Sequence, residues 1–439
     1  MTTCIKDLND LKDIFDELEP QSVEKATDKD IDDFKESLSY FIEDYIDHHI
    51  EKYKEKDFET TMFEDLCDII KDGYLHIDIE EYFENYDQYQ HTIWDAMQIY
   101  FHKTNTFRSY SNTTILKNPD VNIIKNKLKS YENLEQPEQQ SKEWFIFRRE
   151  GLSASDLYKA LDTDSKQNQL ILSKCLPIDF NKKFSTNINS ACHNGHKYEP
   201  LSIMHYEKDF DTKVGEFGCI RHKTHKFLRA SPDGINIDPN SPRYGRLVEV
   251  KNPTSRQLDG IPKKEYWVQM QLQMEVWDLD ECDFLETVFK EYESEEEFRK
   301  DGESFTRTNE NLRKGIIVQF FHNDKPHYEY PPVDIDEKEF DDWYDEIMEK
   351  NKDMTYIMNL YWYLKDYSCV LVTRNKKWFN CVYPKLKNLW DTVLKERETG
   401  YEHRRPKRKN KVKKTSKDPL QENIVIKIRT ESFDDINKN

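Results

Sequence analysis

The sequence predicts an α/β fold in which a mixed central sheet is flanked by helices, with an acidic helical domain before it and a basic tail after it. Three observations support this prediction. From Trp144 onward, stretches with helical periodicity alternate with short strand-like runs, as expected of a sheet covered by helices. Residues 1–100 hold 9 Lys and Arg against 29 Asp and Glu. A dense basic run, HRRPKRKNKVKKTSK, occupies His403–Lys417.

Residues 1–130 are expected to form the acidic, mainly helical domain. The stretch DIDDFKESLSYFIEDYIDHHIEKY alternates charged and apolar residues near the helical period. No metal-ligand spacing stands out here, so we interpret the domain as a packing or partner-contact module, with DNA mimicry or a protein-docking role as the alternatives. The chain has a net charge of −19, and residues 1–100 account for −20. The remainder is therefore nearly neutral and free to approach a polyanion.

Residues 131–143 are predicted to be a linker, because the stretch ENLEQPEQQSKEW is rich in Gln, Glu and Pro. The main domain is expected over residues 144–400 and begins with a helical stretch. Apolar and polar residues then alternate through GEFGCIRHKTHKFLRASPDGI, which predicts strands that end at a Pro-Asp-Gly turn. The run RLVEVKNP predicts a short strand with Val248 and Val250 on one face.

The second half of this domain continues the alternation. KKEYWVQMQLQMEVWDL predicts a helix, and CDFLETVF and KGIIVQFF predict two further strands. From about residue 336 to 400 we expect helices around one more strand-like run, YSCVLVT. Residues 401–439 are basic and then polar, so we expect a disordered tail.

Several classes of protein are disfavoured by composition. The eight Cys residues are scattered without a CxxC pair, which indicates reduced intracellular thiols rather than a disulfide framework or a zinc site. We find no run of about 18 apolar residues, so no membrane span is expected. The N-terminus has no apolar signal region, and secretion is not expected.

The strand–turn–strand region contains the residues that could carry chemistry. A period of two places Glu249 and Lys251 on the same face of a strand, and Asp233 lies at the end of the preceding strand. Two carboxylates can hold Mg²⁺, and the backbone carbonyl of Val250 is a plausible further ligand. A metal site of this kind can hydrolyse phosphodiesters. Taken alone, the pattern is weak, since a solvent-exposed edge strand would also explain it.

Further motifs surround this pattern in a fixed order. They are W-x3-R-x6-S at Trp144, Arg148 and Ser155, G-x3-E at Gly195 and Glu199, S-P-D-G at Ser231–Gly234, E-x-K-x-P at Glu249, Lys251 and Pro253, and Y-x2-Q-x-Q at Tyr266, Gln269 and Gln271. Together they resemble the bacteriophage lambda exonuclease group, also called YqaJ-like viral recombinase nucleases, within the PD-(D/E)XK nuclease superfamily. The resemblance covers about residues 138–330 and implies a PD-(D/E)XK nuclease core.

The resemblance also implies roles for the matched residues. Asp233 and Glu249 would bind Mg²⁺, with Mn²⁺ as an alternative and two ions per site expected. Lys251 would position or deprotonate the attacking water, for which a lysine is suited because its pKa responds to its surroundings. Glu199 would serve the second ion or its water shell, and Gln269 would orient Lys251 or the nucleophile. The expected pocket for a terminal 5′-phosphate consists of Arg148, Ser155 and Ser231.

Each of these residues has a simpler interpretation. Arg148 could form a surface ion pair, Ser155 could cap a helix, and Ser231 could only shape the turn before Pro232. Gln271 and Gln273 are expected to be structural or solvent-facing. A metal role for His193 or His196 is disfavoured, because Mg²⁺ prefers oxygen ligands.

The chain departs from the small phage enzymes in its length. The acidic N-terminal domain and the segment YWYLKDYSCVLVTRNKKWFNCVYPKL make it resemble versions carried by large double-stranded DNA viruses. These additions leave open whether it forms the ring trimer of the phage relatives and whether it depends on DNA ends. The basic tail could be a solvated tail, a non-specific DNA grip or a nuclear localisation signal.

The resulting expectation is a metal-dependent deoxyribonuclease, a 5′→3′ exonuclease on double-stranded DNA ends, serving recombination, replication or repair. The alternatives are a structure-specific endonuclease or resolvase on the same core, and a non-catalytic DNA-binding protein. Double-stranded DNA ends are the expected partner, and the resemblance adds a single-strand annealing protein. The expected location is intracellular, in the host cytoplasm or nucleus.

Overall fold

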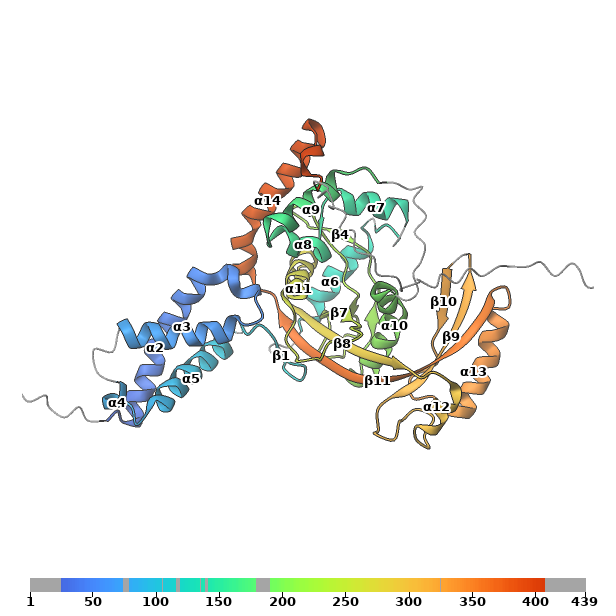
Figure 1. Cartoon of the computed structure of the whole chain (residues 1–439), viewed down its shortest axis with the longest axis horizontal. Coiled ribbons are helices and arrows are strands. Elements are labelled where there is room, and N and C mark those ends of the chain that lie inside the picture. The colour runs from blue at the N-terminus through green and yellow to red at the C-terminus, as the bar shows by residue number, and fades with distance from the viewer. Residues whose placement is uncertain are drawn as a thin grey trace, which may run out of the picture.

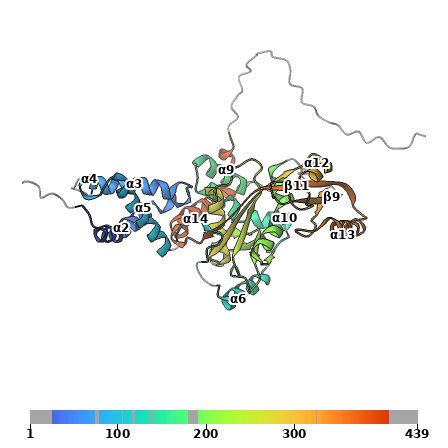
Figure 2. The same ribbon diagram turned by 90° about the horizontal axis from the view of Figure 1, so that it is seen from below.

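The computed structural model describes residues 25–406, except 74–78, 105, 116–118, 135, 139–140, 179–189 and 324. A helical domain lies at one end, a central sheet covered by helices occupies the middle, and a smaller lobe of strands and helices lies at the other end (Figure 1). The same three parts follow one another in the view turned by 90° (Figure 2). No described helix is long and apolar enough to cross a lipid bilayer. The expected disordered tail falls mostly on residues 407–439, which lie outside the described residues.

The N-terminal domain is mainly helical. Its elements are α2 (Asp28–His49), the 3-10 helix η1 (Ile50–Lys54), α3 (Phe58–Gly73), α4 (Ile79–Tyr82) and α5 (Tyr86–Thr104). Helix α2 begins with a capping box, in which Thr27 accepts from the backbone of Asp30 and the Asp30 carboxylate accepts from the backbone of Thr27. Its buried face carries Leu38 and Ile42, each 1% exposed. The apolar periodicity seen in the sequence therefore marks the core of this domain.

The helical domain docks on the central part through η1. The rings of Tyr53 and Trp267 lie 5.9 Å apart, and both side chains are 1% exposed. Nζ of Lys54 donates to the carbonyl of Leu161 at 2.8 Å. After the short strand β1 (Tyr110–Ser111), helix α6 (Val121–Glu132) packs on the central part, where Oη of Tyr131 donates to the carbonyl of Trp277 at 2.6 Å.

The central sheet is mixed, as the sequence predicted. Its strands are β3 (Val214–Gly215), β6 (Gly234–Asn236), β7 (Leu247–Lys251), β8 (Glu281–Glu291), β9 (Lys314–His322), β10 (Lys325–Glu329) and β11 (Thr355–Thr373). Their order is β10-β9-β11-β8-β7-β6-β3, and β1 pairs with β11. Strands β7 and β8 are parallel, whereas β6–β7, β8–β11 and β9–β11 are antiparallel.

Helices cover both faces of this sheet at β7. Leu247 belongs to the core that contains helix α11 (Lys264–Trp277). Val248 and Val250 pack with Tyr206 of helix α10 (Ala191–Phe210). The alternation along β7 follows from the period of two, and it directs Glu249 toward α11.

A second, three-stranded sheet lies beside the central one. Its order is β2-β5-β4, with bounds β2 (Leu152–Ser153), β4 (Ile220–Arg221) and β5 (Leu228–Ala230). The helices around it are α7 (Lys142–Arg149), α8 (Ala154–Ala160) and α9 (Asp164–Cys175). The alternating stretch before the Pro-Asp-Gly turn therefore divides between two sheets.

The C-terminal part agrees in type with the sequence prediction but not in strand length. Its helices are α12 (Glu295–Lys300), α13 (Glu337–Lys350), α14 (Lys376–Thr399) and the 3-10 helix η2 (Glu402–Arg404). The expected run YSCVLVT is only the last part of β11, which has 19 residues. Register shifts at Leu364/Asp366 and Tyr356/Met358 interrupt its pairing. The C-terminal part of β11 pairs with β8 and its N-terminal part pairs with β9.

Candidate active site

Asp233 lies in the tight connection between β5 and β6 and is tied to β7. Its backbone N–H donates to the carbonyl of Val248 at 3.2 Å, and its Oδ2 accepts from the N–H of Val250 at 2.7 Å. Because β6 pairs antiparallel with β7, the carboxylate is held beside the strand that carries Glu249. This connection brings together the two carboxylates that the sequence analysis placed on successive strands.

Glu249 is fully buried and is held by two glutamines of α11. Its Oε1 accepts from Nε2 of Gln269 at 2.6 Å, and its Oε2 accepts from Nε2 of Gln273 at 2.6 Å. A buried carboxylate requires such donors, because removing it from water is otherwise costly. The two amides fix the rotamer of Glu249 and direct its oxygens.

For Gln273 the solvent-facing interpretation is wrong, and the structural one is confirmed. It is fully buried, and besides Glu249 its Nε2 bonds the carbonyl of Ser231 at 3.1 Å. The spacing of four residues from Gln269 places both amides on one helix face and could have identified it. The structural interpretation holds for Gln271, which donates to the carbonyl of Thr373 at 2.8 Å and accepts from the N–H of Asn375 at 2.7 Å.

Lys251 completes this group on the same face of β7. Its Nζ donates to Oε1 of Glu249 and to the carbonyl of Val250, the latter at 3.1 Å. Burial lowers the pKa of Lys251, but attraction to Glu249 and Asp233 outweighs burial and leaves the pKa above its ordinary value. The ammonium group therefore lies among the carboxylates as a cation.

Glu199 comes from α10 and lines a cleft of about 800 Å³ together with Asp233, His196 and Glu216. Burial raises the pKa of Glu199, and repulsion from Glu249 raises it further. Electrostatic coupling thus links Glu199 to the other two carboxylates. His193, by contrast, is engaged elsewhere, since its Nε2 lies 2.6 Å from Oη of Tyr328.

The resemblance implies Mg²⁺ at this site, and the oxygen ligands present there are suited to that ion. Across the residues that the structure describes, no three His, Cys, Asp or Glu side chains converge into a ready-made metal cluster. Mg²⁺ needs fewer, because it usually keeps several waters and binds one or two protein carboxylates. Burial and repulsion from Glu249 raise the pKa of Asp233 well above its ordinary range. A divalent cation would relieve that repulsion, so Asp233, Glu249 and the carbonyl of Val250 fit such an ion.

Arg148 and Ser155 meet at the ends of α7 and α8. Nη2 of Arg148 donates to Oγ of Ser155 at 2.8 Å and to Oγ of Ser153 at 3.3 Å. The guanidinium also lies 4.6 Å from the ring centroid of Trp144. The N-cap of α8 is Ser153, so the helix-cap interpretation of Ser155 is wrong. Arg148 was also interpreted as a surface ion pair. Its Nη2 lies 3.9 Å from Asp156, which is a long distance for such a pair.

The sequence analysis missed two residues at this corner, Ser153 and Lys174. It also expected Ser231 here, but that residue bonds elsewhere. Ser153 bonds Arg148 and the Asp156 carboxylate, the latter at 3.0 Å. Lys174 is 6% exposed and donates to the carbonyl of Arg148 at 3.0 Å. The Ser231 hydroxyl donates instead to the carbonyl of Phe217 at 3.4 Å. No local sequence signal marks Lys174, since it comes from α9.

Taken together, the mixed sheet, its covering helices and the Asp233–Glu249–Lys251 group have the arrangement that the sequence analysis expected of a PD-(D/E)XK nuclease core. Residues 143–280 match the family model described as the YqaJ-like viral recombinase domain. The resemblance drawn from the motifs is therefore confirmed over these residues.

Relatives extend this comparison. An uncharacterised protein of Acanthamoeba polyphaga mimivirus, R354, is 34% identical over 322 residues, which are 64% of this chain and 55% of that protein. The chain thus spans about half the length of that relative. Among solved structures, an alkaline exonuclease from Laribacter hongkongensis is 18% identical, with a TM-score of 0.34 over 59% of this chain and 95% of that one. A phage-related exonuclease from Haemophilus somnus is 14% identical, with a TM-score of 0.30 over 57% of this chain and 94% of that one.

Proposed function

We propose that the chain is a divalent-metal-dependent deoxyribonuclease that degrades one strand of duplex DNA from its 5′ end. The observation that carries this proposal is the convergence of Asp233, Glu249 and Lys251, with Glu249 buried and held by two amides. The YqaJ-like domain supports DNA as the substrate, because its family is described as a viral recombinase. Mg²⁺ is the proposed ion and Mn²⁺ the alternative.

The proposed chemistry divides among these residues. The ion, when bound, would polarise the phosphate and lower the pKa of a water. Asp233, Glu249 and the Val250 carbonyl would hold it, and Glu199 would serve a second ion or its water. Lys251, as a cation beside Glu249, would orient the attacking water and neutralise charge on the phosphate. Gln269 would keep Glu249 and Lys251 in register, since its amide bonds the oxygen that also accepts from Lys251.

The proposed end specificity depends on Arg148. Its guanidinium is free to present further donors beside Ser153 and Ser155, and such a fork suits a terminal phosphate. A phosphate held there would place the 5′ end of one strand in a defined orientation to the cleavage site. Ser231 remains a proposed member of this pocket through the turn it shares with Asp233.

Digestion of end-labelled DNA tests the proposal. A linear duplex with either 5′ end labelled is incubated with Mg²⁺ or EDTA, beside closed circular DNA and a Glu249→Gln control. We expect metal-dependent release of 5′ mononucleotides from linear DNA only, and none from the control variant. Nicked or linearised circles would instead show an endonuclease on the same core. Absence of any digestion would contradict enzymatic function.

A further inference from the structure

A groove of about 760 Å³ lies between α6 and the turn that joins β4 to β5. This turn has the sequence RHKTHK, Arg221–Lys226, and carries three cations in six residues. Arg221, Lys223 and Lys226 line the groove and are exposed. No carboxylate of the described residues is within ion-pair distance of these three cations. They are therefore available to an anion from outside the chain.

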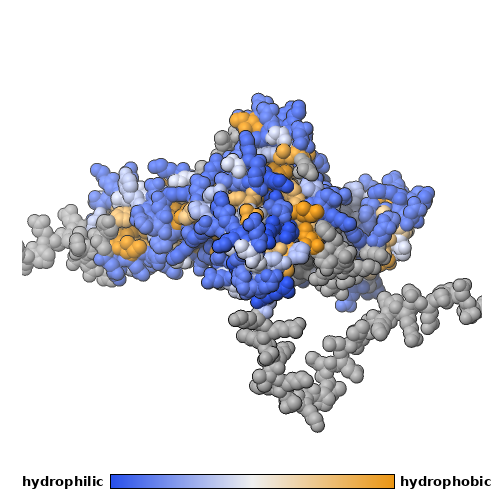
Figure 3. All heavy atoms as spheres, turned by 90° about the horizontal axis from the view of Figure 1, so that it is seen from above, coloured by the Kyte–Doolittle hydropathy of each residue, from blue (hydrophilic) through white to orange (hydrophobic). Residues whose placement is uncertain are grey.

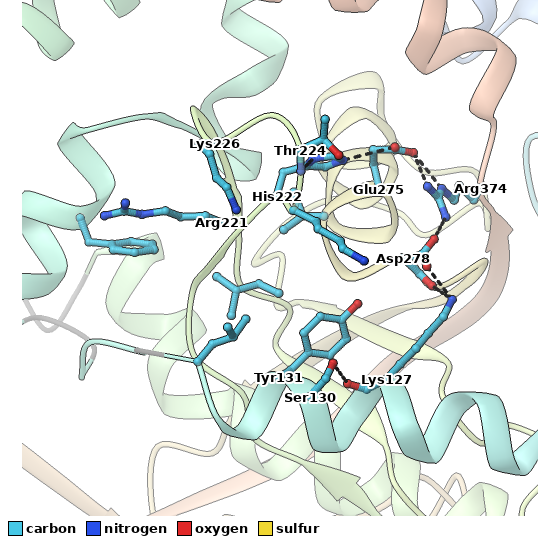
Figure 4. A pocket seen from close by; sticks show the side chains of 15 residues that line it. Lys127, Ser130, Tyr131, Arg221, His222, Thr224, Lys226, Glu275, Asp278 and Arg374 are labelled. Carbon is cyan, nitrogen blue, oxygen red and sulfur yellow. Dashed lines mark hydrogen bonds and ion pairs between the residues drawn. The ribbon is translucent and has the colours of Figure 1, made fainter.

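The turn is held rigidly by a chain of polar contacts (Figure 4). Nδ1 of His222 accepts from the backbone N–H of Thr224 at 3.0 Å and of His225 at 2.8 Å. Nε2 of the same ring lies 3.5 Å from Glu275, which Arg374 holds at 2.8 Å. These contacts fix the backbone of the turn, so little backbone entropy is lost when an anion binds to its side chains.

The series of polar contacts from His222 through Glu275 to Arg374 extends to the far wall of the groove. Arg374 also contacts Asp278 at 2.8 Å, and Asp278 pairs with Lys127 of α6 at 2.8 Å (Figure 4). The acidic side chains of the groove are thus already neutralised by partners. The net surplus of positive charge comes from Arg221, Lys223 and Lys226.

The floor of the groove is aromatic and apolar. Tyr131, Leu134, Phe147, Ile220 and Val276 line it. The Tyr131 ring is fixed by its bond to the carbonyl of Trp277, and Arg221 lies 4.8 Å from the centroid of the Phe147 ring. Phe147 is buried and covered by Arg221 and Arg229, whereas Tyr131 is half-buried and is the ring that a base can reach. A ring beside exposed cations suits single-stranded nucleic acid, because bases stack on aromatic rings while phosphates meet the cations.

The groove adjoins the proposed phosphate pocket. Phe147 lines the groove, and Arg148, the next residue of α7, carries the guanidinium of that pocket. The face of the molecule drawn in Figure 3 is largely hydrophilic, with separate apolar patches. The chain has a net charge of −19 and as a whole repels polyanions. The positive charge of this groove therefore differs in sign from the chain's overall charge.

We propose that this groove binds single-stranded DNA, namely the strand that the active site leaves uncut. The inference rests on the proposed function for the choice of strand, but the binding itself does not require cleavage. Each phosphate that meets a cation of the turn releases counterions, so binding here is salt-dependent. An acidic protein segment is the competing occupant and is distinguished by the test below.

The test measures binding of a fluorescent oligothymidine by the full chain in EDTA, across a series of salt concentrations. The groove variant is R221A/K223A/K226A. The matched control is K338A/K350A/K352A, which removes three exposed lysines in and just after α13, in the lobe at one end of the molecule, whereas the groove lies in the central part (Figure 1). We expect the groove variant to bind at least tenfold more weakly at low salt, with a slope of log K against log salt smaller by about 2. The control should stay within about twofold.

The outcomes separate the two proposals. Unchanged oligothymidine binding by the groove variant would overturn the groove, whatever the nuclease assay shows. Loss of polyglutamate binding with unchanged oligothymidine binding would also overturn it, in favour of a protein partner. Groove-dependent binding by a chain that cuts no DNA would retain the inference and reject the proposed function. Equal melting temperatures of parent and variants exclude misfolding, as expected for exposed side chains.

Discussion

Nε2 of Gln273 lies 2.6 Å from Oε2 of Glu249 and 3.1 Å from the carbonyl oxygen of Ser231. One buried amide therefore joins strand β7 to the turn that carries Asp233. Glu249 and the turn that leads to Asp233 are thus both bonded to α11. We therefore expect α11 to align the carboxylates of Asp233 and Glu249.

Replacing Gln273 by Ala should weaken both metal use and cleavage. The loss of the amide frees Glu249 and leaves a buried acceptor unpaired, and comparable supporting residues typically cost about 10–100-fold in metal affinity or activity. Mg²⁺ titration of the cleavage rate checks this prediction. Lys338→Ala, far from the site, should behave as the parent. A Gln273→Ala variant with an unchanged Mg²⁺ requirement would count against the alignment role.

Mg²⁺ should stabilise the fold through Asp233. The ion relieves the repulsion that raises the pKa of Asp233, so it binds the folded chain more tightly than the unfolded one. At a concentration a hundredfold above Kd, the free energy of unfolding rises by about 2.7 kcal/mol. Thermal unfolding with Mg²⁺ or EDTA measures this without reference to activity. Asp233→Asn should lose the stabilisation, and a persistent shift in that variant would place the ion elsewhere.

Arg148→Ala should abolish the preference for phosphorylated 5′ ends. The guanidinium supplies the charged donors of the pocket, so its removal should slow cleavage of a 5′-phosphorylated duplex about tenfold or more. A duplex with a 5′-hydroxyl should be affected much less. Arg148→Lys should rescue only partly, because an ammonium lacks the planar fork. Equal losses on both substrates would instead indicate a structural role.

Tyr53→Ala should loosen the helical domain from the nuclease core. The ring is 1% exposed and lies against Trp267 at the start of α11, and truncating a buried aromatic residue costs about 3 kcal/mol or more. Urea unfolding followed by tryptophan fluorescence measures the loss. Tyr40→Ala is the matched control, since Tyr40 is 75% exposed and its removal should change little. A stable Tyr53→Ala variant would show that the two parts are independent.

Lys174 should make stability depend on alkaline pH. Burial lowers the pKa of Lys174 to about 8, whereas its ordinary value is 10.5. Between these values the unfolded chain holds more protons than the folded one, so this residue's contribution to stability increases as the pH rises from about 8 to 10.5. The contribution is absent at lower pH, where Lys174 is charged in both states. The difference in unfolding free energy between parent and Lys174→Met, measured across this range, should rise with pH, and a flat difference would contradict the assignment.

Local patterns predicted much of the fold. The period of two in LVEVK and the period of 3.6 in YWVQMQLQM identified β7 and α11, because alternation of side chains depends only on backbone geometry. The mixed sheet followed from the order of these patterns. The same reasoning placed Glu249 and Lys251 on one face of a strand, and the motif order added the family.

Other features were decided by tertiary structure. Gln273, 24 residues away, is one of the partners of Glu249, and Ser155, on the next helix, is one of the partners of Arg148. β11 extends well beyond its apolar run, because β8 and β9 supply hydrogen bonds along its whole length. Burial of Lys174 and the groove beside Arg221 likewise arise only when separate segments pack together. The sequence by itself determined which residue types lie on each face of a strand or helix. The contacts between distant segments were decided by tertiary packing.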